Sequence, residues 1–190
     1  SKDKTLEKYT SVLRENVEEL NGLIQEILDF RKAEDAGFSH THIRRVSVSS
    51  LLRTQFEWFY PLSEQHQIQF KIDAPKELYW NTDSVYFKKI LANLISNAFK
   101  YTEDGGTVRI SLHEEENFLV LKVYNTGKGI EEADMQNIFD RYRILGTMDN
   151  DDNRQNTARN GLGLFICHSL VQSLGGKIDI ESEAVSYTHL

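Results

Sequence analysis

The chain has 190 residues, 39% of them hydrophobic and 27% charged, and a formal net charge of −7. This length and composition are typical of a globular protein with one ordinary domain and an appendage. The acidic balance argues against binding nucleic acid through its phosphates, because that mode needs clustered Lys and Arg. Any anionic ligand must therefore be held locally, by a few cations and by backbone amides.

No apolar run approaches the ~20 residues that cross a bilayer, and the start, "SKDKTLEKY", lacks the apolar stretch of a signal peptide. Cys167 is the only cysteine, which excludes an internal disulfide. Its apolar setting, "LFICHSL", predicts an inert buried thiol. We therefore expect a cytoplasmic location.

Residues 6–30 carry apolar side chains at alternating spacings of three and four. This pattern predicts one long amphipathic helix, whose apolar stripe needs partners in a helical bundle or a dimer. The stripe consists of Leu6, Tyr9, Leu13, Leu20, Leu23, Ile27 and Phe30, with one polar exception at Asn16. We assign residues 1–36 to this bundle and residues 37–45 to a linker.

The remaining residues, 46–190, alternate between strand and helix patterns and predict an α+β fold, a two-layer sandwich of a mixed, largely antiparallel sheet with helices on one face. A helix starts from a cap at Ser49 or Ser50, and a second one from Thr82 or Asp83. The predicted strands are 44–48, 67–73, 107–114, 118–125 and 177–182, and the predicted helices are 49–65, 81–101, 132–139 and 161–174. Residues 145–160 are polar and unpatterned, which is typical of a functional lid or of disorder.

Three short stretches suggest a common site. "NLISNAFKYT" (93–102) places Asn93 and Asn97 one helical turn apart on an otherwise apolar helix. "NTGKGI" (125–130) follows a strand, and its glycines allow a sharp turn close to a flat ligand. "NGLGL" (160–164) precedes a helix, where exposed N–H groups and the positive end of the helix dipole favour a phosphate.

The order of these motifs, with "IFDRYR" before the polar stretch, resembles the ATP-binding domain of sensor histidine kinases. That domain belongs to a superfamily with gyrase, MutL-type mismatch-repair ATPases and heat-shock chaperone ATPases. The resemblance covers roughly residues 45–190. The stretch "LYWNTDSVYFKKILANLISNAFKYT" especially resembles hybrid two-component sensors of Bacteroides type.

The resemblance assigns ATP and Mg²⁺ as ligands. It implies that Asn97 ligates the Mg²⁺, that Asn93 lines the same site, and that Arg141 lies near the γ-phosphate. Arg143 falls one residue short of the family's second arginine. The implied nucleotide-binding set is Asn93, Asn97, Lys100, Tyr101, Asn125, Gly127, Gly129, Ile130, Arg141, Gly161, Leu162, Gly163 and Leu164, with Lys100 on a phosphate, Tyr101 beside the adenine and Phe139 in the motif before the lid.

Two positions depart from the family pattern. Asn125 stands where an aspartate usually accepts a hydrogen bond from the adenine amino group. An amide oxygen keeps the acceptor but loses the charge that strengthens such a bond. Arg159 replaces a glycine that the family often has two places before Gly161.

Asn93 discriminates between activities. The gyrase-type and chaperone-type ATPases usually carry a glutamate there, which activates water, and an asparagine cannot accept that proton. The sequence therefore favours a histidine kinase that transfers the γ-phosphate. Two alternatives stay open: an ATP-hydrolysing module of the gyrase or chaperone type, and a pseudokinase or dimerisation module that has lost nucleotide.

None of the six histidines leads into the family's phosphoacceptor motif, a histidine followed by an acidic residue and Thr-Pro. We therefore expect the acceptor upstream of Ser1 and the chain to be a fragment that does not autophosphorylate by itself. The resemblance further implies a homodimer through the N-terminal bundle, a response-regulator receiver domain as partner, no direct contact with nucleic acid, and a place in the cytoplasmic part of an inner-membrane sensor.

Overall fold

A computed structural model describes residues 41–140 and 163–182. The predicted helix at residues 6–30 and the polar stretch at 145–160 lie outside these ranges, as do the last eight residues. Among the described residues, no helix is both long and apolar enough to cross a membrane.

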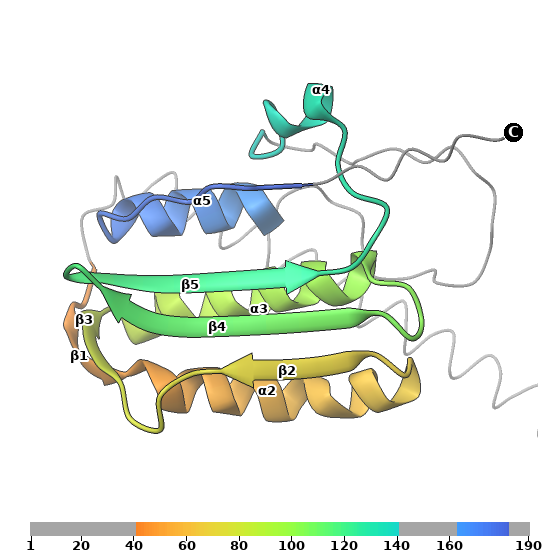
Figure 1. The fold of residues 1–190 in the computed structure, drawn as a ribbon. Helices are drawn as coiled ribbons and strands as arrows, with labels where there is room; N and C mark the ends of the chain where they lie inside the picture. The colour runs from red at the N-terminus through yellow and green to blue at the C-terminus, as the bar shows by residue number, and fades with distance from the viewer. Residues whose placement is uncertain (1–40, 141–162, 183–190) are drawn as a thin grey trace, which may run out of the picture.

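Four helices and five strands form the described part of the chain (Figure 1). In chain order they are β1 (Arg44–Ser47), α2 (Val48–Gln65), β2 (Gln69–Asp73), β3 (Tyr79–Thr82), α3 (Ser84–Tyr101), β4 (Thr107–Glu115), β5 (Phe118–Asn125), α4 (Glu132–Met135) and α5 (Gly163–Ser173). β1 and β3 form an antiparallel pair, and the main sheet has the order β2-β4-β5. In that sheet β2 is parallel to β4, and β4 is antiparallel to β5.

The main sheet has one apolar face and one polar face because side chains alternate along its strands. In β4, Val108, Ile110 and Leu112 are fully or almost fully buried. Arg109, between them, is exposed on the opposite face. Figure 1 shows the strands of this sheet in front of α2 and α3, with α5 above them. Helices therefore cover the apolar face of the sheet.

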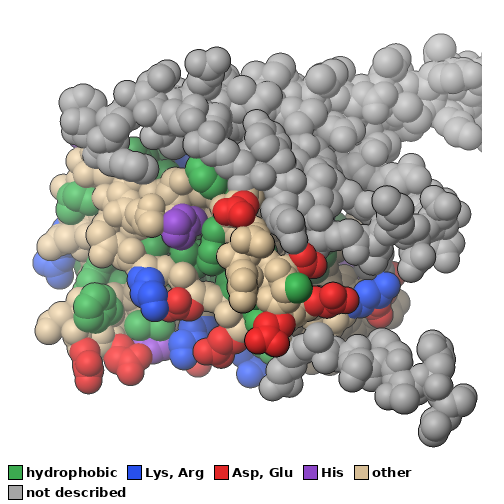
Figure 2. All heavy atoms as spheres, turned by 90° about the horizontal axis from the view of Figure 1, so that it is seen from above, with side chains coloured by type: hydrophobic (Ala, Val, Ile, Leu, Met, Phe, Trp, Pro, Cys, Tyr) green, Lys and Arg blue, Asp and Glu red, His purple; other side chains and the backbone are tan. Residues whose placement is uncertain are grey.

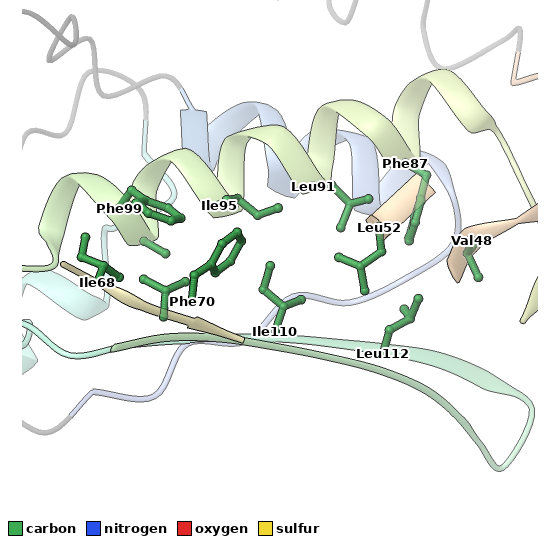
Figure 3. Close-up of a cluster of buried hydrophobic side chains, with 12 residues drawn as sticks. Val48, Leu52, Ile68, Phe70, Phe87, Leu91, Ile95, Phe99, Ile110 and Leu112 are labelled. Atoms are coloured by element: carbon green, nitrogen blue, oxygen red, sulfur yellow. The ribbon is translucent and has the colours of Figure 1, made fainter. Parts of the chain in front are cut away.

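Helix α3 packs on two sides. Leu91 and Ile95 are fully buried in the cluster that the sheet shares with α2 and α3, and Figure 3 shows them together with Phe70 and Ile110. Ile90, on a different side of α3, is buried in a second cluster with Ile166 and Leu170 of α5. The helix is therefore held between the sheet and α5.

The start of α3 is fixed by a side-chain cap. Asp83 accepts hydrogen bonds from the backbone N–H groups of Val85 (2.8 Å) and Tyr86 (3.2 Å), which have no partner within the helix. At the other end, the hydroxyl of Thr102 donates to the carbonyl oxygen of Ala98 at 2.6 Å. Of the two caps that the sequence allowed, Thr82 and Asp83, the structure uses Asp83.

Most predicted elements are present, and the mixed α+β architecture with helices on one face is confirmed. Four details of the prediction are wrong. Helix α4 ends at Met135, whereas the prediction extended it to residue 139. Helix α2 begins at Val48, before the predicted caps. The short strand β3 was not predicted. Residues 177–182 form no strand in the described part of the chain, although Ile178 and Ile180 are half-buried between exposed neighbours. The segment has the alternation of a strand without its ladder of hydrogen bonds.

The core predicts a large stability difference between two substitutions on α3. Leu91→Ala removes a fully buried side chain and should lower the free energy of unfolding by about 2–5 kcal/mol. Val85→Ala on the same helix removes a side chain that is 55% exposed and should change it by less than about 0.5 kcal/mol. Urea unfolding of both variants checks this, and equal losses would contradict the described core.

Candidate functional site

The two asparagines of α3 lie beside the first residue of α5. A Cβ atom built on Gly163 would stand 3.7 Å from Oδ1 of Asn93, 3.8 Å from Nδ2 of Asn97 and 3.9 Å from Oδ1 of Asn97. All three residues are half-buried. The structure thus brings together three predicted site residues from elements about 70 positions apart in the sequence.

Cys167, one turn into α5, contacts the side chain of Asn93. Its thiol is fully buried and donates a long hydrogen bond, 3.9 Å, to the carbonyl oxygen of Ile90. Burial raises the pKa of the Cys167 thiol to about 12, and a hydrogen bond from Asn93 offsets only part of that rise. The predicted burial of the thiol is confirmed, and its inertness stays a prediction.

These contacts define the direction of α5. Gly163 is near Asn97 and Asn93, Cys167 contacts Ile90, and Leu170 packs with Ile90. As the numbering rises along α5 it falls along α3, so the two helices are antiparallel. The N-terminus of α5, where the first N–H groups have no partner within the helix, therefore lies beside the amides of α3.

A second group of predicted residues meets at the C-terminal end of α3. A Cβ atom on Gly127 would stand 2.5 Å from the carbonyl oxygen of Tyr101 and 3.4 Å from Nδ2 of Asn125. Only glycine allows the turn after β5 to approach the helix so closely. Asn125 donates from this Nδ2 to the carbonyl oxygen of Thr126 at 3.4 Å. The ammonium group of Lys100 lies 5.5 Å from the centre of the Tyr101 ring.

The turn continues through two further predicted residues. Gly129 has a φ of +73°, which favours glycine. The backbone N–H of Ile130 donates to the hydroxyl of Ser182 at 2.8 Å, which ties this turn to the segment after α5. Leu164 is half-buried in the first turn of α5. Arg141, Arg143, Gly161 and Leu162 lie outside the described residues, and their roles stay predictions.

One contact at the site was not predicted. The ring of Phe139 stacks on that of His168 in α5, with 5.2 Å between centroids and 25° between planes. Nε2 of His168 lies 3.2 Å from Nε2 of Gln172. The helical periodicity of α5 could have indicated that His168 and Cys167 point in different directions, but nothing in the sequence alone connects His168 to Phe139.

The chemistry of this arrangement is that of a polar ligand held by amides and backbone. Asn93 and Asn97, four residues apart on one side of α3, lie beside the start of α5, and the backbone carbonyl of Tyr101 meets the turn after β5. The described residues contain no group of three or more His, Cys, Asp or Glu side chains that could hold a metal ion. In Figure 2, which views the molecule from above, the described Lys and Arg side chains lie among acidic ones.

Comparison with known families matches residues 82–189 to the family described as "Histidine kinase-, DNA gyrase B-, and HSP90-like ATPase". The chain is 30% identical over 181 residues to the sensor histidine kinase WalK of Bacillus subtilis, which covers 92% of this chain and 28% of WalK. It is 28% identical over 188 residues to the sensor protein IrlS of Burkholderia pseudomallei, covering 96% of this chain and 39% of IrlS. The chain thus spans well under half the length of these curated relatives.

Solved structures show the same fold. Full-length ShkA in complex with AMPPNP has a TM-score of 0.71 and 22% identity, covering 92% of this chain and 36% of ShkA. Histidine kinase ThkA in complex with the response regulator protein TrrA has a TM-score of 0.65 and 21% identity, covering 90% of this chain and 46% of that one. The narrower resemblance to Bacteroides-type hybrid sensors stays a prediction.

Two glycine substitutions should differ in their effect on stability, because a Cβ atom clashes with the backbone at Gly127 but not at Gly163. Gly127→Ala forces a Cβ atom to within 2.5 Å of a backbone oxygen and should destabilise the fold by about 1–3 kcal/mol. Gly163→Ala is the matched control, because its Cβ atom makes contacts of 3.7–3.9 Å, which are ordinary van der Waals distances. Thermal unfolding should show a lower midpoint for the first variant only, and equal midpoints would contradict the close approach of Gly127 to α3.

Burial of Cys167 predicts a thiol that does not react in the folded chain. Its raised pKa, about 12, leaves almost no thiolate at pH 8, and the thiolate is the reactive form. Ellman's reagent should therefore label one thiol per chain in denaturant and almost none without it. Rapid labelling of the folded chain would show that the interface between α3 and α5 is open.

Proposed function

Because the chain belongs to the histidine kinase-, DNA gyrase B- and HSP90-like ATPase family, we propose that it is the Mg-ATP-binding catalytic domain of a two-component sensor histidine kinase. Its reaction is transfer of the ATP γ-phosphate to a histidine that lies upstream of Ser1. The sensor histidine kinases among its relatives support this choice within the family.

The observation that carries the proposal is the meeting of Gly163 with both asparagines of α3. A Cβ atom on Gly163 would be in van der Waals contact with both amides, so the backbone at the start of α5 closely approaches the two asparagines. Helix N–H groups and amide side chains are suited to phosphate oxygens, and the positive end of the α5 dipole favours their charge. We assign the phosphate groups of the nucleotide to this meeting point of Gly163, Asn93 and Asn97.

The donor set fits Mg²⁺. A hard divalent cation prefers oxygen ligands and is commonly bound through few protein groups together with substrate phosphates. Asn97 supplies such an oxygen, and Asn93 places a second amide oxygen beside the same glycine. Bound there, Mg²⁺ would neutralise part of the phosphate charge. Asn97 would hold the ion, and Asn93 would orient the phosphate oxygens beside it.

The base of the nucleotide is assigned to the C-terminal end of α3. Tyr101 and Gly127 are in contact there, and Asn125 directs its amide nitrogen to the Thr126 carbonyl, which turns its side-chain oxygen the other way. That oxygen is the acceptor proposed for the adenine amino group. Gly129 and Ile130 form the following part of this wall, and Lys100 is proposed to reach a phosphate.

The neighbours of Asn93 favour transfer over hydrolysis. Hydrolysis in this superfamily needs a group that takes a proton from water, and an asparagine amide does not do so. Cys167, the side chain behind Asn93, keeps its proton because its pKa is raised to about 12 by burial. Steady release of phosphate from ATP with normal turnover would instead support the hydrolase alternative.

The partners proposed for the whole protein are a second copy, through the helix bundle to which residues 1–36 are assigned, and the receiver domain of a response regulator. The solved complex of ThkA with the response regulator protein TrrA supports the second partner. The protein is proposed to act in the cytoplasm, as the catalytic part of an inner-membrane sensor. Direct binding of nucleic acid is not part of the proposal.

Replacing Asn97 tests the metal site. Asn97→Ala removes one of the amides beside Gly163 and should weaken binding of a fluorescent ATP analogue in Mg²⁺ by roughly 10–100-fold, the effect of losing a hydrogen bond or ligand to a charged group. In EDTA the same variant should bind the analogue about as the wild type does. Fluorescence titration with and without Mg²⁺ measures both affinities.

The matched control is Asn81→Ala, which removes an exposed amide on β3 and should leave both affinities unchanged. Circular dichroism of each variant checks that the fold is intact. Unchanged Mg²⁺-dependent binding by Asn97→Ala would refute the assigned metal ligand. Failure of the wild type to bind the analogue at all would support the pseudokinase alternative.

A further inference from the structure

Asp83 connects two segments that are 41 residues apart. Its Oδ1 accepts the hydrogen bonds from Val85 and Tyr86 that cap α3. Its Oδ2 accepts a hydrogen bond of 2.9 Å from the backbone N–H of His42, in the segment that leads into β1. The side chain is almost completely buried, with 4% of the residue exposed. One carboxylate therefore holds both the start of α3 and the chain that precedes the domain.

Further contacts join the same two segments. The guanidinium group of Arg44 donates to the hydroxyl of Ser84 at 3.1 Å, so the first residue of β1 contacts the first residue of α3. Arg44 is also paired with Thr82 in the antiparallel ladder of β1 and β3. The path of the chain from residue 42 to residue 44 is thereby fixed against the start of α3.

The bonds at Asp83 require the charged carboxylate. Burial raises the pKa of Asp83, but backbone N–H donors from His42, Tyr86 and Val85 lower it by more, so the pKa lies below its usual value. A hydrogen bond to a charged acceptor is stronger than a neutral one. Only a carboxylate of this size offers two acceptor oxygens: an asparagine would direct an NH₂ group at one of these donors, and a serine has a single oxygen.

We propose that Asp83 is a positioning residue that couples the segment before the domain to the nucleotide site through α3. The inference rests on the proposed function, because α3 carries Asn93 and Asn97. These residues lie ~15 and ~21 Å from Asp83 along the helix axis at the usual rise per residue. Since α3 is packed against the sheet on one side and α5 on another, a displacement at its start moves the helix as a unit.

Coupling of this kind works in both directions. If the position of residue 42 changes nucleotide affinity by some factor, nucleotide must favour the corresponding position of residue 42 by the same factor. The coupling can therefore be measured at either end. The bond from His42 involves its backbone N–H and not its imidazole, which permits a clean pair of variants.

His42→Pro removes the donor N–H and leaves the Asp83 cap of α3 in place. His42→Ala is the matched control, because it removes the imidazole but keeps the N–H. Asp83→Ser breaks the same link from the other side, since its one oxygen can cap α3 but cannot also accept from residue 42. All variants are made in the 190-residue chain, and circular dichroism checks that each is folded.

The first measurement is hydrogen exchange at the amides of residues 43–46, with and without the Mg²⁺ complex of a non-hydrolysable ATP analogue. In the wild type and in His42→Ala, the analogue should slow exchange there. In His42→Pro and Asp83→Ser it should have no such effect. The second measurement is affinity for the analogue, which His42→Pro should lower about fivefold, at the lower end of measured couplings between sites. The double variant His42→Pro/Asp83→Ser should lose no more than the larger single effect.

Equal protection and equal affinity in His42→Pro and His42→Ala would overturn the coupling. Failure of the proposed function gives a different result, because the wild type would then not bind the analogue. In that case exchange without nucleotide still decides whether the link exists. Faster exchange at residues 43–46 in His42→Pro than in His42→Ala would support it, and equal exchange would overturn it.

Discussion

The packing of α3 between the sheet and α5 is the constraint on which the rest of the structure depends. Its fully buried Leu91 and Ile95 fix one side of the helix on the sheet, and its buried Ile90 fixes another side on α5. The rotation of the helix about its axis is then determined. Asn93 and Asn97 consequently stand beside Gly163, the first residue of α5. The apolar pattern of α3 thus sets the geometry of its polar groups.

Glycine contributes to the site in three physically different ways. Gly127 permits a contact between backbone segments that any side chain would prevent, whereas Gly129 adopts a positive φ. Gly163 is different again, because a Cβ atom there would fit without strain. Its small size is not required by packing within the described residues, which is why we connect it with a ligand. The sequence motifs show all three glycines alike, and only the structure separates these roles.

The fold was predictable wherever periodicity was long enough. Helix α3 and the hairpin of β4 and β5 follow from patterns of eight or more residues. The start of α2 was misplaced because Ser49 uses its hydroxyl elsewhere, accepting from the N–H of Leu78 and donating to the carbonyl of Lys76. Strand β3 has four residues, too few to show alternation. Residues 177–182 alternate but lack the ladder, which periodicity cannot reveal.

The sequence could predict which residues belong to the site but not what surrounds them. Motif order selected Asn93 and Asn97 for one site, and the structure brings both against Gly163. The pattern could not distinguish their surroundings, since contacts across 70 residues leave no local signal. Asn93 contacts the buried thiol of Cys167, whose raised pKa keeps it protonated, and lies beside Gly163. Neither neighbour can take a proton from water. The general base that the gyrase-type and chaperone-type ATPases usually have at this position is therefore not replaced by either of these two contacts. Both contacts are compatible with the proposed transfer of the γ-phosphate to a histidine, because neither adds a base beside Asn93.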